Sequence, residues 1–86
     1  MAKILISEAD PDVRRLLTVL VGRLGHEAVV IDPDVAVPPR ADLLLLEPGR
    51  RSARTSAPDL PVIWTKKPFT IAQMRMQILR SLAIGS

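Results

Sequence analysis

Residues 3–30 read KILISEADPDVRRLLTVLVGRLGHEAVV, and this stretch decides the fold. Residues 3–7 form a short apolar run that is typical of a strand buried on both faces. A helix is expected directly after it, because Asp10 is a good N-cap, Pro11 suits the first helical position and apolar residues recur at helical spacing from position 13 to 24. Gly25 supplies the helix stop, and residues 27–31 predict a second strand.

The rest of the chain predicts two more strands and a second helix. Residues 42–46 (DLLLL) and 60–65 (LPVIWT) are the strands, and Thr70 with Gln73 forms a capping box that begins the helix. Residues 32–39 and 48–59 are rich in Pro, Gly or Ser and predict irregular connections. We therefore expect one α/β domain over residues 1–86, a minimal flavodoxin-like fold with about four parallel strands and two helices on one face.

Composition excludes several classes of function. The 86 residues carry a net charge of +3, with no cysteine and one histidine, so disulfides, thiolate metal sites and histidine metal clusters are excluded. The single histidine, His26, follows Gly25 and is expected in a surface loop. No apolar stretch approaches the roughly 20 residues of a membrane span, and the N-terminus lacks the pattern of a signal peptide. A cytoplasmic protein without a membrane partner is expected.

Three stretches together resemble the receiver domain of response regulators. Residues 4–30 resemble the opening of that domain, DLLLLEP at 42–48 resembles its third strand, and LPVIW followed by KKPF resembles its later strands and the lysine-proline turn before its last helix. The resemblance implies a two-component signalling protein with the CheY-like fold. In that family an acidic pair after the first strand holds magnesium and an aspartate ending the third strand accepts the phosphoryl group. A Thr or Ser and a lysine complete the site.

The departures from this pattern imply a degenerate phosphoacceptor site. One member of the acidic pair is replaced by Ala9, and the acceptor position holds a glutamate, which is one methylene too long for the same in-line position. Lys67 is expected to pair with the acceptor-position glutamate and to precede a cis proline, with Lys66 as the alternative lysine. The resemblance assigns these residues to the site: Glu8, Asp10, Glu47, Thr65 and Lys67. The sequence is equally compatible with a purely structural role for Glu8, in which its negative charge stabilises the N-terminus of the nearby helix.

The leading functional hypothesis is therefore a pseudo-receiver. It would be non-enzymatic, without cofactor, independent of phosphorylation, and active through contacts with a signalling partner. Helices that the family has on the second sheet face find no counterpart in the sequence, so we expect that face to be bare and to form a homodimer contact near Trp64. Trp64 also suits simple packing within the chain.

Two alternatives remain open on the sequence. The first is an active phosphoacceptor that uses Glu8, Asp10 and Glu47 with magnesium. The second is a small nucleic-acid-binding protein with an anion patch at Arg50, Arg51 and Arg54. No aromatic residues interleave with these arginines, so a solvated loop is the simpler interpretation and a nucleic-acid partner is not expected.

Overall fold

The computed structural model describes residues 1–31, 41–48 and 60–85, leaving aside the side chains of residues 84 and 85. Within these ranges all the predicted strands and helices are present, with bounds within two residues of those expected. The predicted irregular connections lie almost wholly outside the described residues. The elements, in chain order, are β1 (Lys3–Ser7), α1 (Pro11–Arg23), β2 (Glu27–Val30), β3 (Leu43–Leu46), β4 (Val62–Trp64) and α3 (Ile71–Gly85).

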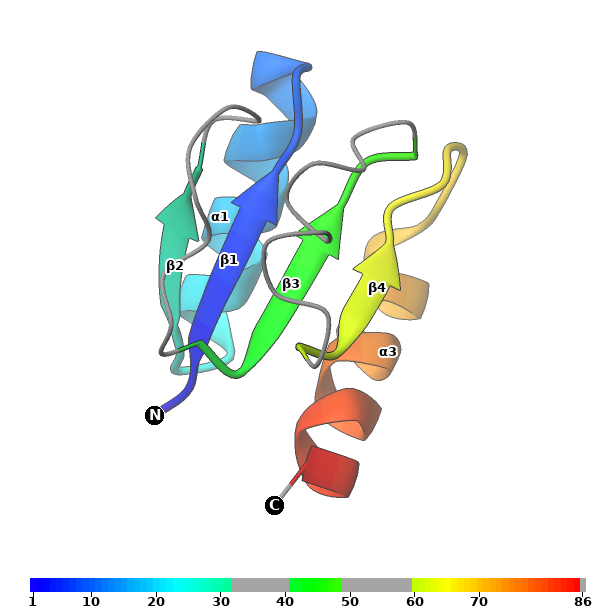
Figure 1. Ribbon diagram of the computed structural model, residues 1–86. Helices are drawn as coiled ribbons and strands as arrows, with labels where there is room; N and C mark the ends of the chain where they lie inside the picture. The colour runs from blue at the N-terminus through cyan, green and yellow to red at the C-terminus, as the bar shows by residue number, and fades with distance from the viewer. Residues whose placement is uncertain (32–40, 49–59, 86) are drawn as a thin grey trace.

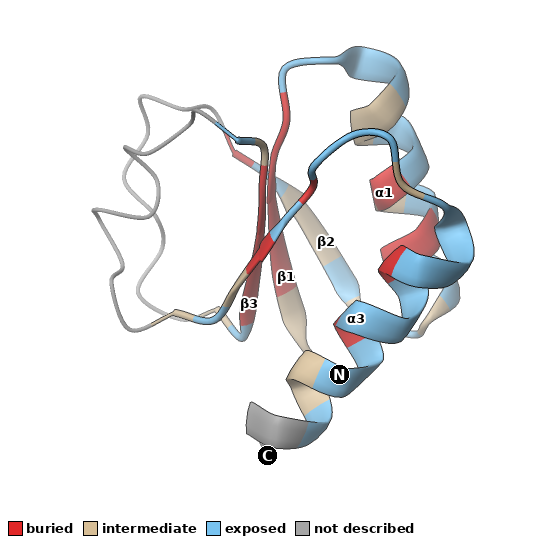
Figure 2. Cartoon of the chain, turned by 90° about the vertical axis from the view of Figure 1, so that its right-hand side faces the viewer, coloured by how far each residue is buried: buried red, intermediate tan, exposed pale blue. Residues whose placement is uncertain are grey.

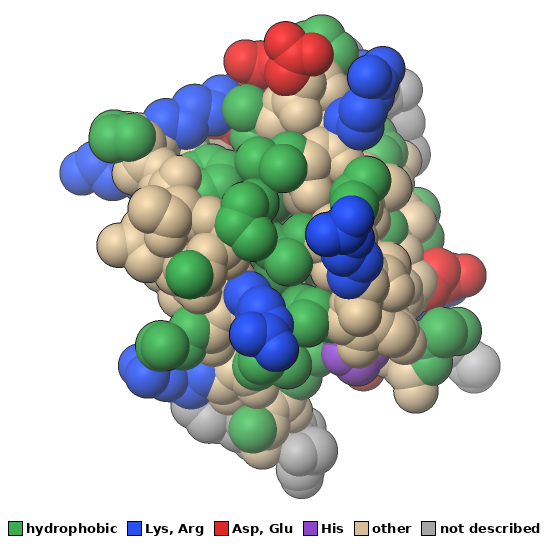
Figure 3. Space-filling view, turned by 180° about the vertical axis from the view of Figure 1, so that it is seen from behind, with side chains coloured by type: hydrophobic (Ala, Val, Ile, Leu, Met, Phe, Trp, Pro, Cys, Tyr) green, Lys and Arg blue, Asp and Glu red, His purple; other side chains and the backbone are tan. Residues whose placement is uncertain are grey.

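The strands form one parallel sheet in the order β2-β1-β3-β4. Helices α1 and α3 both lie on the same face of this sheet, α1 behind β1 and β2 and α3 behind β3 and β4 (Figures 1 and 2). Seen from behind, the two helices form the surface of the molecule (Figure 3). The predicted fold class, a parallel sheet of four strands with two helices on one face, is confirmed.

Local capping interactions fix where both helices begin. Asp10 Oδ1 accepts hydrogen bonds from the backbone N–H of Asp12 at 2.9 Å and of Val13 at 3.4 Å, which satisfies two N–H groups of the first turn. In α3 the capping box is complete, because Gln73 N donates to Thr70 Oγ1 at 3.1 Å and Thr70 N donates to Gln73 Oε1 at 3.0 Å. No helix in the described part of the chain is long and apolar enough to cross a membrane.

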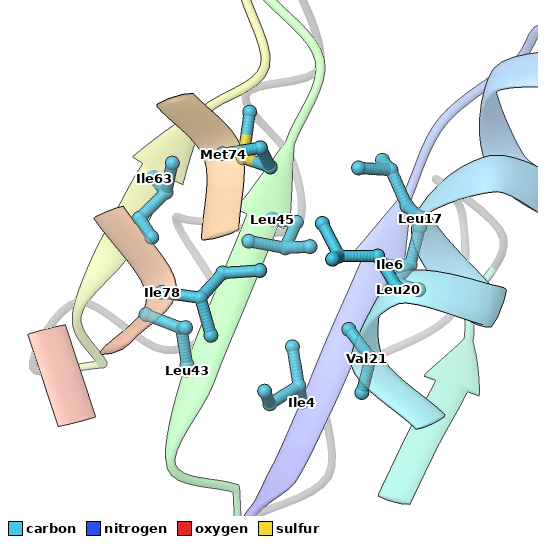
Figure 4. Close-up of a cluster of buried hydrophobic side chains, with 10 residues drawn as sticks. All are labelled: Ile4, Ile6, Leu17, Leu20, Val21, Leu43, Leu45, Ile63, Met74 and Ile78. Atoms are coloured by element: carbon cyan, nitrogen blue, oxygen red, sulfur yellow. The ribbon is translucent and has the colours of Figure 1, made fainter. Parts of the chain in front are cut away.

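The main core lies between the sheet and the helices. Side chains of a strand alternate between its two faces, so every second residue of β1 and β3 points toward α1 and α3. These side chains meet apolar residues of both helices in a single cluster (Figure 4). Its buried members are Ile4, Ile6, Leu17, Leu20, Val21, Leu43, Leu45, Ile63, Met74 and Ile78.

The opposite face of the sheet is also buried, so the prediction of a bare face is wrong. Its cluster consists of Leu5, Ile31, Leu44 and Leu46, and the three leucines have no exposed surface in a single chain. Ala41 and Leu60, which lie outside the strands, pack against this cluster. Residues that flank β3 and β4 thus contribute to the cover of this face. Homodimerisation therefore stays a prediction that can no longer rest on an uncovered sheet face.

Trp64 stands at the end of the edge strand β4. It is in register with Leu46 of β3, and its side chain shares the face of Val62, which packs against the second cluster. The residue is 39% exposed. Its position is compatible with packing at the margin of this face, and a contact with a second copy through Trp64 stays a prediction.

Candidate functional site

The carboxyl ends of the parallel strands bring the predicted site residues to one edge of the sheet. Glu8 directly follows β1, Glu47 follows β3, and Thr65 follows β4. Backbone hydrogen bonds continue the ladder past the strand ends, since Glu47 N donates to Ser7 O and Thr65 N donates to Leu46 O, both at 3.0 Å. In open α/β sheets this edge is where binding sites form.

Lys67 reaches both carboxylates of this edge. Its Nζ lies 3.2 Å from Glu8 Oε2, with which it forms a hydrogen bond, and 3.7 Å from Glu47 Oε2. The predicted pair with Glu47 is therefore present, and the peptide bond between Lys67 and Pro68 is cis, as predicted. The shorter contact, with Glu8, was not predicted. Lys66 is exposed and is not the lysine that reaches the two carboxylates.

Asp10 lies beside the site but serves the helix. Its carboxylate oxygen Oδ1 caps α1, and its backbone N–H donates to Glu8 Oε2 at 3.1 Å. Glu8 Oε2 thus accepts from both Lys67 and the Asp10 backbone. Asp10 contributes its backbone N–H to the site, and its carboxylate caps the helix and acts on Lys67 only through its charge.

Burial dominates the electrostatics of Glu8. The side chain of Glu8 has no exposed surface, and this loss of hydration raises its pKa above the ordinary value of 4.5. A side-chain hydrogen bond with the Glu47 carboxyl raises this pKa further, while the Asp10 N–H and Lys67 act in the opposite direction. Burial and the neighbouring Glu47 carboxyl therefore both disfavour the charged form of Glu8.

The same contacts act on Lys67. Its hydrogen bond with Glu8 raises the pKa of its ammonium group, and partial burial opposes that shift. The side chain is 41% exposed, so solvent screens the pair on one side. The lysine stays charged and supplies the cation between the two carboxyl groups.

The residues present do not fit a divalent cation. Among the described residues no group of three or more His, Asp or Glu side chains is arranged to hold a metal. One oxygen of Glu8 is committed to Lys67 and a backbone N–H, and Asp10 caps a helix. Magnesium is usually held through one or two carboxylates together with several waters, and here the Lys67 ammonium group already contacts both carboxylates of this edge.

Two buried polar atoms of the site lack hydrogen-bond partners among the described residues, Glu8 Oε1 and Thr65 Oγ1. Both residues are almost fully buried, at 2% and 1% exposure. A buried carboxyl oxygen without a donor is costly when charged, which agrees in direction with the raised pKa of Glu8. No pattern along the chain indicated that these two polar atoms would be buried.

The third candidate site, the patch of Arg50, Arg51 and Arg54, lies outside the described residues. His26, expected in a surface loop, has a structural partner that sequence reasoning missed. Its Nδ1 accepts a hydrogen bond from Ala2 N at 3.0 Å. That bond joins the start of the chain to the turn after α1.

Comparison with known proteins supports the fold. NtrX from Brucella abortus, in complexes with ADP and with ATP, superposes with a TM-score of 0.80 at 20% sequence identity over 98% of this chain. A CheY-like response regulator from Mesorhizobium loti superposes with a TM-score of 0.70 at 16% identity, over 99% of this chain and 98% of its own. This chain has the fold of a response-regulator receiver domain.

The likeness to receiver domains is one of structure. It spans 26% of the NtrX chain in the ADP complex and 27% in the ATP complex. No family model matches the sequence, and no curated protein matches it either. In this chain Glu8, Glu47 and Thr65 directly follow β1, β3 and β4, and Lys67 lies two residues past Thr65.

Proposed function

We propose that this chain is a cytoplasmic pseudo-receiver, a non-enzymatic module that acts through protein contacts independently of phosphorylation. The observation that carries the proposal is the Lys67 ammonium group between the carboxylates of Glu8 and Glu47, at 3.2 and 3.7 Å. Phosphoryl transfer depends on placing the acceptor in line and on neutralising charge with metal ions. Here one lysine already balances the acceptor-position glutamate, and no metal is needed for that balance.

The charge arrangement supports a module that is held in one state. In a receiver site, phosphorylation adds negative charge near the conserved lysine. In this chain the Glu8 carboxyl group already contacts Lys67, because it is buried beside the lysine and accepts its hydrogen bond. The surface that binds the partner would then be in its binding conformation without phosphorylation.

Incubation with acetyl phosphate and magnesium, followed by intact-mass measurement, tests the proposal. The expected result is no gain of a phosphoryl group. The double variant Ala9→Asp, Glu47→Asp is the matched control, because it restores both family residues and is expected to gain a labile adduct. A phosphoryl adduct on the unaltered chain that Glu47→Gln abolishes would establish the active phosphoacceptor instead.

A further inference from the structure

The outer face of α3 carries an apolar stripe that the core does not use. Met76 and Leu79 are 58% and 44% exposed, and both lie on the side of α3 away from the buried residues Met74 and Ile78. At about 100° per residue, Ala72, Met76 and Leu79 fall on one side of the helix. Together these three residues, here named the α3 stripe, form an apolar strip on the solvent-facing side of the helix.

Two arginines border the α3 stripe, one on each side. From the same helical geometry, Arg75 and Arg80 lie roughly 70° to either side of its centre. Neither forms an ion pair with a carboxylate of the described residues, and residues 71–85 contain no Asp or Glu. Arg80 contacts only the sulfur of Met76, at 3.7 Å, among the side-chain contacts seen here. The two guanidinium groups are therefore available to an acidic partner.

The surface around the α3 stripe is a shallow depression that is open to solvent. The stripe and its two arginines line a hollow of about 550 Å³. Figure 3 shows hydrophobic side chains gathered over and between the two helices, with Lys and Arg side chains both among them and at the edges of this face. Leu16 and Val19 of α1, 43% and 47% exposed, add apolar surface on the same side of the molecule.

We infer that the α3 stripe is the docking site for an acidic amphipathic helix of a partner protein. Such a helix would place its apolar side chains on Met76 and Leu79 and glutamates or aspartates on both margins, facing Arg75 and Arg80. A second copy of this chain fits poorly, because two copies would bring arginines against arginines. An anionic membrane suits the charge, but the α3 stripe offers only two large apolar side chains, fewer than the broad apolar face of an interfacial helix.

This inference rests on the proposed function, because it names the surface through which the pseudo-receiver acts. The probe is a fluorescent synthetic peptide of the length of α3, 15 residues, with leucines at helical spacing and glutamates elsewhere. A second peptide replaces every glutamate with lysine. Anisotropy titration measures both affinities, and amide chemical shifts of the labelled protein locate the contact.

The acidic peptide is expected to bind and the basic one not to bind. Arg75→Glu with Arg80→Glu should weaken the acidic peptide by about tenfold or more, and Leu79→Gln should also weaken it, with shifts confined to α3 and the adjoining part of α1. Lys66→Glu is the matched control and should change nothing. Equal binding by the double arginine variant, or no binding at all, overturns the inference.

Two further outcomes would overturn the inference and assign the α3 stripe to another occupant. Tight binding to phosphatidylserine vesicles without peptide binding would assign the surface to a membrane. Sedimentation showing a dimer that Leu79→Gln dissociates would assign it to a second copy. Repeating the titration after acetyl phosphate treatment separates the two proposals, because an adduct counts against the pseudo-receiver while lost peptide binding counts against the docking site.

Discussion

Lys67 Nζ lies 3.2 Å from Glu8 Oε2, and this contact joins a residue that follows the last strand to one that follows the first. The lysine is 41% exposed whereas the Glu8 side chain has no exposed surface. The pair therefore differs from a surface salt bridge, because only the lysine keeps its hydration. The charged form of the buried Glu8 carboxyl group is therefore stabilised by neighbouring protein groups and not by water.

Glu8→Gln is expected to change how stability depends on pH. Because the folded-state pKa of Glu8 is raised above 4.5, the stability from its protonated form is complete below that value and is lost as pH rises through the raised pKa. The variant has no carboxyl group at position 8 and therefore does not lose this stability. Its free energy of unfolding, relative to that of the unaltered chain, should increase between about pH 4 and about pH 8. Urea unfolding across that range measures it. A relative decrease would show that Lys67 and the Asp10 N–H outweigh burial.

Lys67→Met is expected to destabilise the fold, more at about pH 8 than at about pH 5. The substitution keeps an apolar stem and removes the cation, so the carboxyls of Glu8 and Glu47 are left to repel each other when both are charged. Lys66→Met is the control and should have little effect, because Lys66 is exposed. The double variant Lys67→Met, Glu8→Gln should recover most of the loss. If it is as unstable as the single variant, the lysine does not act through Glu8.

Thr65→Val is expected to leave the free energy of unfolding unchanged or to raise it by up to about 1 kcal/mol. Thr65 is 1% exposed, and its hydroxyl has no hydrogen-bond partner among the described residues. Valine has the same shape without the polar atom. Thr65→Ser is the matched control, because it keeps the hydroxyl, removes the methyl group and should cost about 1 kcal/mol. A large loss in the valine variant would reveal a partner for the hydroxyl.

Leu44→Ala is expected to cost about 3 kcal/mol of unfolding free energy, equally at low and high protein concentration. Leu44 has no exposed surface in a single chain, so its burial needs no second copy. Leu79→Ala, at a residue that is 44% exposed, should cost under about 0.5 kcal/mol. If the cost of Leu44→Ala grows with protein concentration, the result would support a homodimer that buries the second sheet face.

The fold was predictable because local signals and apolar pattern agree. KILIS and LLLL are apolar at successive positions, as a strand buried on both faces requires, and Asp10 and Thr70 supply side chains that cap helices. Each signal lies within a few residues of the element that it specifies. The order of the elements then left few topologies open.

The details of the site were less predictable, because they depend on distances across the sheet. Family positions placed Lys67 near Glu47, but which carboxylate is closer depends on how β1 and β3 sit beside each other and on the path after β4. Spacing along the chain also could not show that Ala41 and Leu60 pack against the second face. The prediction that the second sheet face is bare was wrong for that reason.

The order in which the strands and α3 are translated has a consequence for synthesis of this sheet. Strand β1 is translated before its two neighbours β2 and β3, and the helix that covers β3 and β4 is translated after all four strands. Until α3 emerges, Leu43, Leu45 and Ile63 lack the cover that Met74 and Ile78 provide. Premature termination therefore releases chains with an open apolar surface, which are substrates for chaperones and proteases.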